Sequence, residues 1–214
     1  MATLPSGTIL SVASAFAAAK PVTVVSNAAE ASITCVAHGY IVGDILQMYS
    51  GWGRLNRRVI RVKAVTSVDI IVAELIDTTN LEFFPAGSGT GTIRKVTTFT
   101  QIAKYLNPSQ SGGEPKNVTV RFMDEDTDTN LNDGFTAVTE SFAIDADQFG
   151  TAAYTALRTL SEVQSDTILK KALKNGAFIF TPCKLALNEN VTMADGSIMT
   201  NVVSINGNGR ISRY

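Results

Sequence analysis

The stretch Val118–Ile144 reads VTVRFMDEDTDTNLNDGFTAVTESFAI and decides the fold class. Apolar and polar residues alternate at both of its ends, in Val118–Phe122 and in Phe135–Ile144. A period of two is typical of a half-buried strand. The segment between the two ends is polar and finishes on the turn sequence Asn132-Asp-Gly134. We therefore predict a long β-hairpin that carries an acidic loop.

This hairpin lies inside a gap in positive charge. No Lys or Arg occurs from Phe122 to Leu157, whereas the rest of the chain has an excess of basic residues. The gap contains eight carboxylates: Asp124, Glu125, Asp126, Asp128, Asp133, Glu140, Asp145 and Asp147. An anionic surface repels nucleic acid at short range. Such a surface suits either the passage of DNA without binding or the binding of a cation.

The acidic loop has some likeness to a calcium-binding loop. An EF-hand needs Gly at its sixth position and Glu at its twelfth. Neither the register that starts at Asp124 nor the one that starts at Asp126 places these residues there. We expect a solvated acidic loop, and a less regular Ca²⁺ site stays open as an alternative.

The sequence on either side of the hairpin is also mostly β. Before it, short alternating runs are separated by Gly, Asn and Asp, which indicates a small barrel or sandwich. The expected strands there are 8–13, 22–25, 31–36, 45–49, 58–65, 70–75 and 92–96, with a flexible loop at 85–91. Residues 99–106 suit either a strand or one helical turn, and 107–115 is predicted to be a long loop stiffened by two prolines.

After the hairpin the period changes from two to that of a helix. We predict helices at 151–163 and 165–174, then strands at 177–181 and 184–187 on either side of Pro182, and a last strand at 198–205. The predicted fold class is therefore mainly β (α+β), a sheet or sandwich backed by a helical segment.

The alternation also predicts which side of the sheet is wet. Val138, Phe142 and Ile144 form an apolar face, and Met199, Val203 and Ile205 form another on the last strand. The opposite faces carry small polar side chains, which include Thr139, Ser141, Thr200 and Ser204. This pattern is expected for an antiparallel sheet with one solvated side. The wet side has almost no aromatic residues, so it does not suggest a binding site with anchor residues.

Residues for catalysis or metal binding are sparse. His38 is the only histidine, and its position in Ala-His-Gly suggests a structural turn residue. Cys35 and Cys183 lie far apart in apolar surroundings, so we expect two buried free thiols and no zinc site. We expect no enzyme activity, no cofactor, no metal, no signal peptide and no membrane-spanning segment.

A basic cluster lies in the first half of the chain, at Arg54, Arg57, Arg58, Arg61 and Lys63. Such a cluster could bind phosphate. Nearby acidic residues bring residues 21–97 close to neutral, so a solvated barrel face is the preferred interpretation.

Several motifs outside the barrel region resemble the major tail tube protein of long-tailed, non-contractile bacteriophages. They cover residues 1–20 and 98–214, and they are Leu4-Pro-Ser-Gly-Thr8, Leu106-Asn-Pro108, Ser111-Gly-Gly-Glu-Pro-Lys116, Asn132-Asp-Gly-Phe-Thr-Ala137, Ile144-Asp-Ala-Asp-Gln-Phe-Gly-Thr151 and Tyr154-Thr-Ala-Leu157. No single motif is diagnostic, and the resemblance depends on their succession.

Residues 22–97 resemble a separate small β-barrel module that occurs in phage structural proteins. The module is remotely similar to a non-catalytic half-domain of ubiquitin-activating enzymes. This similarity implies no ubiquitin chemistry. Its motifs here are Val24-Val-Ser-Asn-Ala28, Ala37–Asp44, Leu55–Val62 and Leu75–Asn80. We therefore predict a discontinuous tube domain of residues 1–20 and 98–214, with an inserted all-β barrel of residues 21–97 on the tube exterior.

The family resemblance implies a virion protein that is assembled in the host cytoplasm. It implies homo-hexameric rings, stacked into a hollow tube for DNA ejection, with a tape measure protein inside and terminator and tip complexes at the ends. We predict that an acidic group of Asp124, Glu125, Asp126, Asp128, Asp145 and Asp147 lines the lumen or the seam between rings, and that Thr139, Ser141, Thr200 and Ser204 face the lumen. DNA would pass without specific binding, and segments 1–7 and 107–116 are expected to order only on stacking.

Two other functions stay open at this point. The first is a carbohydrate- or receptor-binding module on the virion surface, suggested by the barrel with its Tyr49 and Trp52. The second is a hydrolase that uses the carboxylates of Asp124–Asp128.

Overall fold

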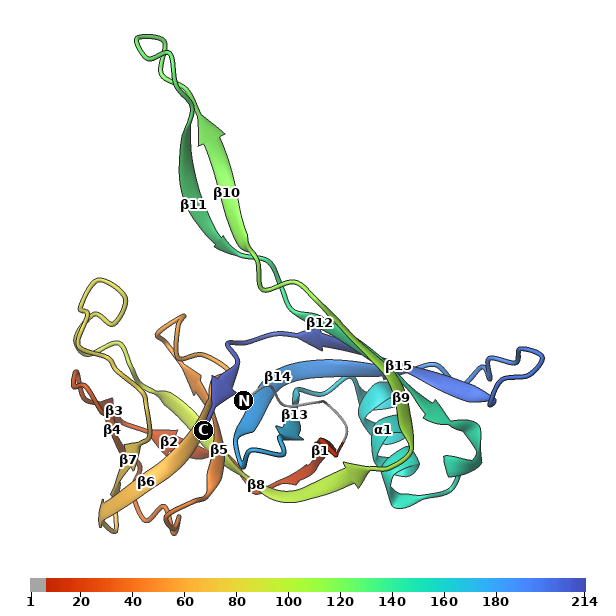
Figure 1. The fold of residues 1–214 in the computed structure, drawn as a ribbon. Helices are drawn as coiled ribbons and strands as arrows, with labels where there is room; N and C mark the ends of the chain where they lie inside the picture. The colour runs from red at the N-terminus through yellow and green to blue at the C-terminus, as the bar shows by residue number, and fades with distance from the viewer. Residues whose placement is uncertain (1–6) are drawn as a thin grey trace.

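The computed structural model describes residues 7–214 and confirms a mainly β fold (Figure 1). Within these residues, a large sheet of 14 strands forms the body of the molecule, and a separate two-stranded ribbon projects from it. One α-helix, α1 (Ala152–Val163), packs against the body. No helix in the described part of the chain has the length and apolar character to span a membrane.

The first half of the described chain contains eight strands. They are β1 (Ile9–Phe16), β2 (Lys20–Val22), β3 (Val24–Val25), β4 (Ser32–Thr34), β5 (Ile45–Ser50), β6 (Val59–Ser67), β7 (Ile70–Ala73) and β8 (Gly91–Ile102). Strands β2 to β7 and the first part of β8 share a buried cluster that includes Ile33, Met48, Trp52 and Ile71, whereas Leu10 and Val12 of β1 belong to the core of the second half. Ile33, Met48 and Ile71 come from the alternating runs that the sequence pattern assigned to a barrel, and Trp52 comes from the loop after one of them.

The second half forms the rest of the sheet and the projecting ribbon. Its strands are β9 (Tyr105–Ser111), β10 (Pro115–Val120), β11 (Thr129–Phe135), β12 (Thr139–Asp145), β13 (Thr167–Ala172), β14 (Phe178–Leu187), β15 (Thr200–Gly207) and β16 (Ser212–Arg213). A short 3₁₀ helix, Ala146–Gln148, leads into α1. The path through the sheet runs β3-β4-β7-β6-β5-β8-β1-β13-β14-β15-β12-β9, with β2 paired to β8 and β16 paired to β14.

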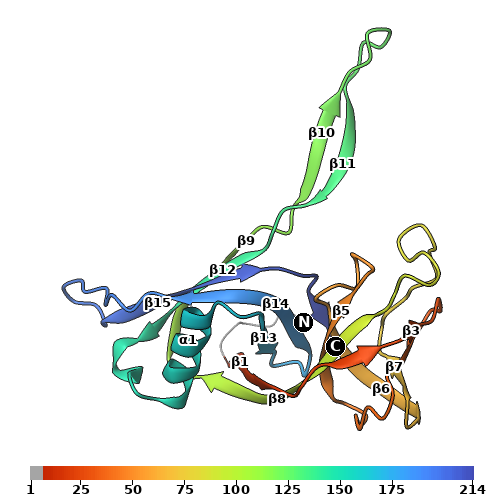
Figure 2. The same ribbon diagram turned by 180° about the vertical axis from the view of Figure 1, so that it is seen from behind.

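Helix α1 covers one face of this second half (Figures 1 and 2). Thr151 caps its start by accepting a hydrogen bond from the Tyr154 backbone N–H at 3.3 Å, and Gln164 ends it in the left-handed region. Leu157 is fully buried and packs in one cluster with Phe142, Leu185 and Val203. The side chains on the alternate positions of β12 and β15 therefore face away from the helix.

The long strand β8 belongs to both halves. Its first residues pair with β5 of the barrel, from Gly91 to Lys95, and its last residues pair with β1, from Val96 to Ile102. The predicted domain boundary between residues 97 and 98 therefore falls within one continuous strand. The division into an inserted barrel and a tube domain stays a prediction.

The predicted helix at 165–174 is wrong, because the structure has strand β13 there. This strand lies between β1 and β14 and pairs with both. Lys170 lies 5.0 Å from the centre of the Phe99 ring, whereas Lys171 forms an ion pair with Glu140. The consecutive lysines thus point to opposite faces, as in a strand. Pairing on both sides overrides the local helical pattern.

The predicted long loop at 107–115 is also wrong. Strand β9 continues to Ser111 and pairs with β12, and β10 begins at Pro115. Pro108 is tolerated because β9 is an edge strand and its register with β12 shifts next to this residue. The prediction that segment 107–116 orders only on stacking does not fit a segment that is already paired in the single chain. The other predicted segment, 1–7, lies almost entirely outside the described residues.

The two strands predicted around Pro182 are a single strand, β14. Pro182 lies opposite Ile168 of β13, and on its other side the pairing with β16 ends at Phe180 while that with β15 begins at Cys183. The missing proline N–H therefore falls in a gap between two ladders, where the sheet needs no donor.

Candidate assembly surfaces

The wet face of the sheet brings the predicted small polar residues together. The register of β12 and β15 places Ser141 opposite Ser204, Thr139 opposite Asn206, and Asp145 opposite Thr200. Edge strand β9 adds Ser109, whose hydroxyl lies 2.7 Å from that of Ser141. This surface lies on the side of the sheet away from α1. Short hydroxyl side chains give it a smooth, hydrated character.

The six predicted acidic residues do not form one group. Asp145 and Asp147 lie at the end of β12 next to α1, whereas Asp124–Asp128 lie at the far end of the hairpin (Figure 1). Asp145 has structural contacts, since its carboxylate accepts the Asp147 N–H at 3.0 Å and lies 3.6 Å from the Lys104 amine. The wet face itself is nearly free of carboxylates and also carries the exposed Lys184 beside Asn206. The assignment of these six residues to lumen or seam stays a prediction.

Strands β10 and β11 form a ribbon that leaves the body of the molecule, as both views show (Figures 1 and 2). Its base is a tight crossing, because a Cβ on Gly112 would lie 2.0 Å from the Ala137 carbonyl oxygen, and Gly112 has a φ of +84°. Only glycine fits this position without a rearrangement of the chain. A hairpin with an acidic tip is confirmed, but its predicted second strand is wrong. Strand β10 pairs with β11, which contains the predicted turn Asn132–Gly134, and the predicted strand 135–144 corresponds to β12, which pairs with β15 and β9.

The ribbon has an apolar face and a polar face although neither is covered by the described residues. Val118 lies opposite Leu131 on one side, with exposed fractions of 47% and 53%, and Thr119 lies opposite Asn130 on the other. At the tip, Phe122 and Met123 are also exposed. Exposed apolar surface of this kind is typical of sites that bind another chain.

Acidic residues follow these two apolar side chains at the tip. Arg121 pairs with Asp128 at 3.9 Å, but Asp124, Glu125 and Asp126 have no cationic partner within residues 7–214. The tip thus presents exposed apolar and anionic groups side by side.

A buried ion pair at the start of β12 was not singled out by the sequence pattern. The Glu140 carboxylate pairs with the Lys171 amine, and their side chains are only 6% and 21% exposed. The second oxygen of Glu140 is buried without a hydrogen-bond partner among the described residues. In the sequence, Glu140 lies at a position of the alternation that is otherwise apolar. This position could have indicated that the carboxylate is buried and needs a cationic partner inside the protein.

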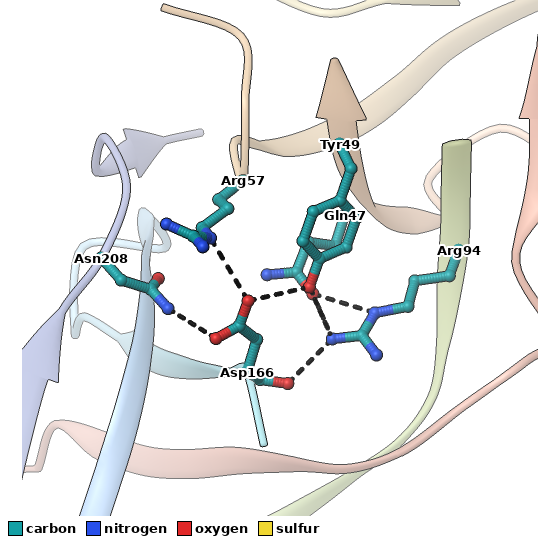
Figure 3. A network of polar contacts seen from close by, with 6 residues as sticks. All are labelled: Gln47, Tyr49, Arg57, Arg94, Asp166 and Asn208. Carbon is teal, nitrogen blue, oxygen red and sulfur yellow. Dashed lines mark hydrogen bonds and ion pairs between the residues drawn. The ribbon is translucent and has the colours of Figure 1, made fainter. Parts of the chain in front are cut away.

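A polar network joins the barrel to the sheet (Figure 3). The Asp166 carboxylate, which precedes β13, accepts hydrogen bonds from the Tyr49 hydroxyl at 3.1 Å and the Asn208 amide at 2.8 Å. The Arg57 guanidinium completes the set at 3.3 Å. Burial is the main cause that raises the pKa of Tyr49, so this hydroxyl stays protonated and able to donate.

Arg94 extends the same network along β8. Its guanidinium donates to the Asp166 carbonyl at 2.8 Å and to the Gln47 side chain at 2.6 Å, and it stacks 3.9 Å from the centre of the Phe16 ring. A charged group that is satisfied from several sides fixes geometry more strongly than a single surface pair. The barrel is therefore held in a fixed orientation on the sheet.

The chain end adds a second contact between the same two parts. The Tyr214 hydroxyl donates to the Val59 carbonyl at 3.0 Å and accepts from the Arg61 N–H at 3.2 Å. Ser212 also donates to the Val59 carbonyl, at 2.8 Å. Strand β16 thus ties the end of the sheet domain to β6 of the barrel.

The aromatic residues that suggested a carbohydrate-binding module are engaged inside the protein. Trp52 is 2% exposed, and its indole N–H donates to the Pro85 carbonyl at 2.9 Å. Tyr49 is part of the Asp166 network. Neither ring offers the open face on which a sugar could stack.

The basic cluster is largely paired, as expected for a barrel face. Arg61 forms an ion pair with Glu74, Lys63 with Glu30, and Arg57 with Asp166. Arg54 stacks on Phe83 with its guanidinium 3.1 Å from the ring centre. Arg58 is the exception, since it has no carboxylate partner in residues 7–214 and its Nε is buried without a hydrogen bond.

The cysteine and histidine predictions are confirmed. Cys35 and Cys183 are both free and buried, and burial raises the pKa of the Cys183 thiol to about 12. His38 is 3% exposed and accepts the Tyr40 N–H at 2.8 Å through Nδ1, while its Nε2 lies 3.2 Å from the Ser67 carbonyl. These groups stabilise the barrel and the sheet.

Comparison with known proteins gives one family and several structures. The family model described as phage tail tube protein, TTP, matches residues 50–214. One similar solved structure, in the virion of a native gene transfer agent particle, shares 12% identity with a TM-score of 0.44 and covers 54% of this chain and 88% of that chain. Another, in the tail of an empty gene transfer agent particle with C6 symmetry, shares 13% identity with a TM-score of 0.42 and covers 53% and 84%. No curated protein matches this chain.

The family match covers most of the chain, including the wet-faced sheet, the hairpin, α1 and part of the barrel. This family is structural and not an enzyme family, in agreement with a site made of hydroxyl groups, sheet edges and a projecting ribbon. The chain belongs to the phage tail tube protein family.

Proposed function

We propose that this protein closes into hexameric rings that stack into a hollow tail tube for the passage of DNA. The observation that carries the proposal is a sheet with one packed face and one face of small hydroxyl side chains, from which a ribbon projects without covering either of its own faces. The family match supports a structural subunit. The hexameric number comes from the family resemblance.

Ring closure requires a contact between unlike surfaces of neighbouring subunits. Strand β9 is the last strand of the sheet path, so its outer N–H and C=O groups have no partner strand in residues 7–214. All its residues except Tyr105 are exposed. An open edge favours pairing with another chain, and a head-to-tail contact closes into a ring when the rotation permits. We assign this edge to the contact within a ring.

The wet face is the best candidate for the lumen. Ser141, Ser204 and Thr139 offer no cationic group, and Lys184 is the one cation that we place on this face, so a passing duplex would release few counterions and gain little binding energy there. Asp145 and Asp147 would lie at one margin of this surface. The acidic hairpin tip would lie at the seam between rings, and the barrel would lie on the tube exterior.

This function places the protein in the virion tail after assembly in the host cytoplasm. The same tube would contain a tape measure protein and would end in terminator and tip complexes. The polar lumen would let both the tape measure protein and the DNA move without specific binding.

Electron microscopy of the concentrated protein tests the assembly directly. We expect negatively stained rings with six-fold symmetry and a central hole wide enough for duplex DNA, and stacks of these rings at higher concentration. Uniform small particles at the highest soluble concentration, with and without a crowding agent, would overturn the proposal.

Cysteine labelling tests which surface faces the lumen. Ser204→Cys lies on the wet face, and Thr90→Cys is an exposed control on the barrel. Both native thiols are buried, so background labelling is low. We expect a bulky polyethylene-glycol maleimide to label both variants before assembly but only Thr90→Cys in tubes. Equal labelling of both in intact tubes would place the wet face outside and refute the lumen assignment.

A further inference from the structure

A cavity of about 570 Å³ lies at the base of the hairpin and contains two arginines without a carboxylate partner. Arg58 comes from the start of β6, Arg210 from the turn before β16, and Phe135 and Ile211 add exposed apolar surface. No acidic side chain in residues 7–214 lies within ion-pair distance of either arginine. The site is therefore cationic and partly apolar.

Two details indicate that this cavity needs a partner. The Nε of Arg58 and the Oδ1 of Asn208 are buried there without hydrogen bonds in the described part of the chain. Burial lowers the pKa of Arg58, and the neighbouring Arg210 acts in the same direction. A buried donor with a second cation beside it is costly until an anion arrives.

The hairpin tip has the complementary composition. Phe122 and Met123 are exposed, and Asp124, Glu125 and Asp126 follow them without a cationic partner. The sequence FMDED thus places two apolar side chains next to three carboxylates. The tip therefore offers carboxylates to the cavity arginines and apolar side chains to the apolar part of the cavity. Specific protein contacts combine these two kinds of pairing.

The tip cannot reach the cavity of its own chain, because Gly113 and Phe135 of the cavity lining lie at the base of the same ribbon. The ribbon carries the tip away from the body (Figure 1). Eleven residue steps separate Gly113 from Asp124, which is roughly 36 Å at about 3.3 Å per residue in an extended strand. A second copy displaced by this length along the ribbon brings its cavity to the tip of the first.

We propose that the hairpin tip of one subunit, Phe122–Asp126, docks into the arginine cavity of a subunit in the next ring. This inference rests on the proposed tube function and names the residues of its axial contact. The carboxylates of the tip pair with Arg58 and Arg210, while Phe122 and Met123 pack against Phe135 and Ile211. Because tip and cavity are different surfaces, each subunit offers one of each. A head-to-tail contact that is displaced along the tube axis repeats from ring to ring without closing.

Charge reversal tests the pairing. In Asp124→Lys/Asp126→Lys we expect the protein concentration needed for tube formation to rise by about tenfold or more, since each ring makes the contact several times. Arg210→Glu, an exposed position, should have the same effect with little effect on folding. The variant that combines all three changes should recover most of the assembly. Glu82→Lys/Asp195→Lys reverses two exposed carboxylates elsewhere and should assemble like the wild type.

The outcomes separate the inference from the function on which it rests. Wild-type protein without rings or tubes would refute the tube function itself. Tubes that form equally well after reversal of the tip or of Arg210 would refute the pairing and leave the tube function standing. Normal tubes in which Arg210→Glu only weakens the binding of duplex DNA would assign the cavity to phosphate and refute the pairing as well. Single rings that persist in the tip variant and stack in the combined variant would support it.

Discussion

The sheet body and the β10–β11 hairpin are both antiparallel β structure, yet they differ in what covers their side chains. Along β12, positions 140, 142 and 144 are buried, and α1 packs over that side. Along β10, every residue is exposed except Val120, which is half-buried. Apolar residues such as Val118 therefore face solvent. The same alternation thus produces a folded core in one region and an unpartnered surface in the other. A strand pattern alone does not show whether its apolar face is buried by the same chain or by another chain.

The largest effect is expected where the body loses packing. Leu157→Ala removes a fully buried side chain from the contact between α1 and the sheet, and we expect a loss of about 3 to 4 kcal/mol in the free energy of unfolding. The matched change on the hairpin, Leu131→Ala, should cost less than about 0.5 kcal/mol in the unassembled protein. Urea unfolding followed by circular dichroism measures both. Equal losses would contradict the contrast between the two regions.

Ion pairs should show the same contrast at a somewhat smaller scale. Lys171→Met leaves the buried Glu140 carboxylate unpaired, and we expect a loss of about 3 kcal/mol. Lys116→Met breaks the exposed Lys116–Asp133 pair of the hairpin, with side chains 63% and 57% exposed, and should cost about 0.5 kcal/mol or less. Thermal unfolding of the two variants would show a large and a small decrease in Tm. A hairpin variant as unstable as the body variant would show that the ribbon is part of the folding unit.

The network between barrel and sheet should be intermediate. Asp166→Ala leaves the Tyr49, Asn208 and Arg57 donors without their acceptor, and we expect a loss of about 2 kcal/mol. Trp52 is the only tryptophan and lies in the barrel core, so its fluorescence follows the barrel, while circular dichroism follows the whole chain. We expect the barrel signal to change at a lower temperature than the overall signal in this variant. Asp128→Ala on the hairpin serves as the control, and coincident transitions in Asp166→Ala would contradict a joint made by this residue.

The smallest expected effect comes from pH. A side-chain hydrogen bond from Arg61 is the main cause that lowers the pKa of Glu74 below its ordinary value near 4.5. A group whose pKa is lower in the folded state contributes stability above its unfolded pKa, and this contribution disappears as pH falls through the folded value. We expect Glu74→Gln to remove a contribution of about 1 kcal/mol or less at neutral pH, and to differ progressively less from the wild type below pH 4.5. A difference that grows with acidification would contradict this sign.

Much of this architecture could be predicted from local alternation, and its errors have physical causes. Helix α1, the barrel strands, the first strand of the hairpin and the polar face of β12 and β15 each depend on a period that the sequence displays. Strand β11 has no such period, so the second strand of the hairpin was assigned wrongly. Strand β13 could not be predicted in this way, because its two neighbours, β1 and β14, come from distant parts of the chain. The same holds for Pro182, whose place in a gap between ladders depends on where β15 ends and β16 begins.

The assembly surfaces divide along the same line. The acidic tip could be recognised from the sequence, because it is a continuous stretch. Its separation from Asp145 and Asp147 could not, because it depends on the length and direction of the ribbon. The arginine cavity joins residues from β6, the hairpin base and the last turn of the chain, so no local pattern predicts it. Arg58 looked like one member of a basic cluster, and only the pairing of its neighbours shows that it stands apart.

Strand β8 also has a mechanical meaning. A force that pulls the barrel along this strand loads the β8–β5 ladder at one end and the β8–β1 ladder at the other in shear, so several hydrogen bonds resist together. A module on a flexible tether would instead swing freely and transmit no torque. Arg94 and Asp166 hold the barrel and the sheet together at the crossing point. In the proposed tube with the barrel outside, a force applied to the barrel would therefore be transmitted to the tube wall.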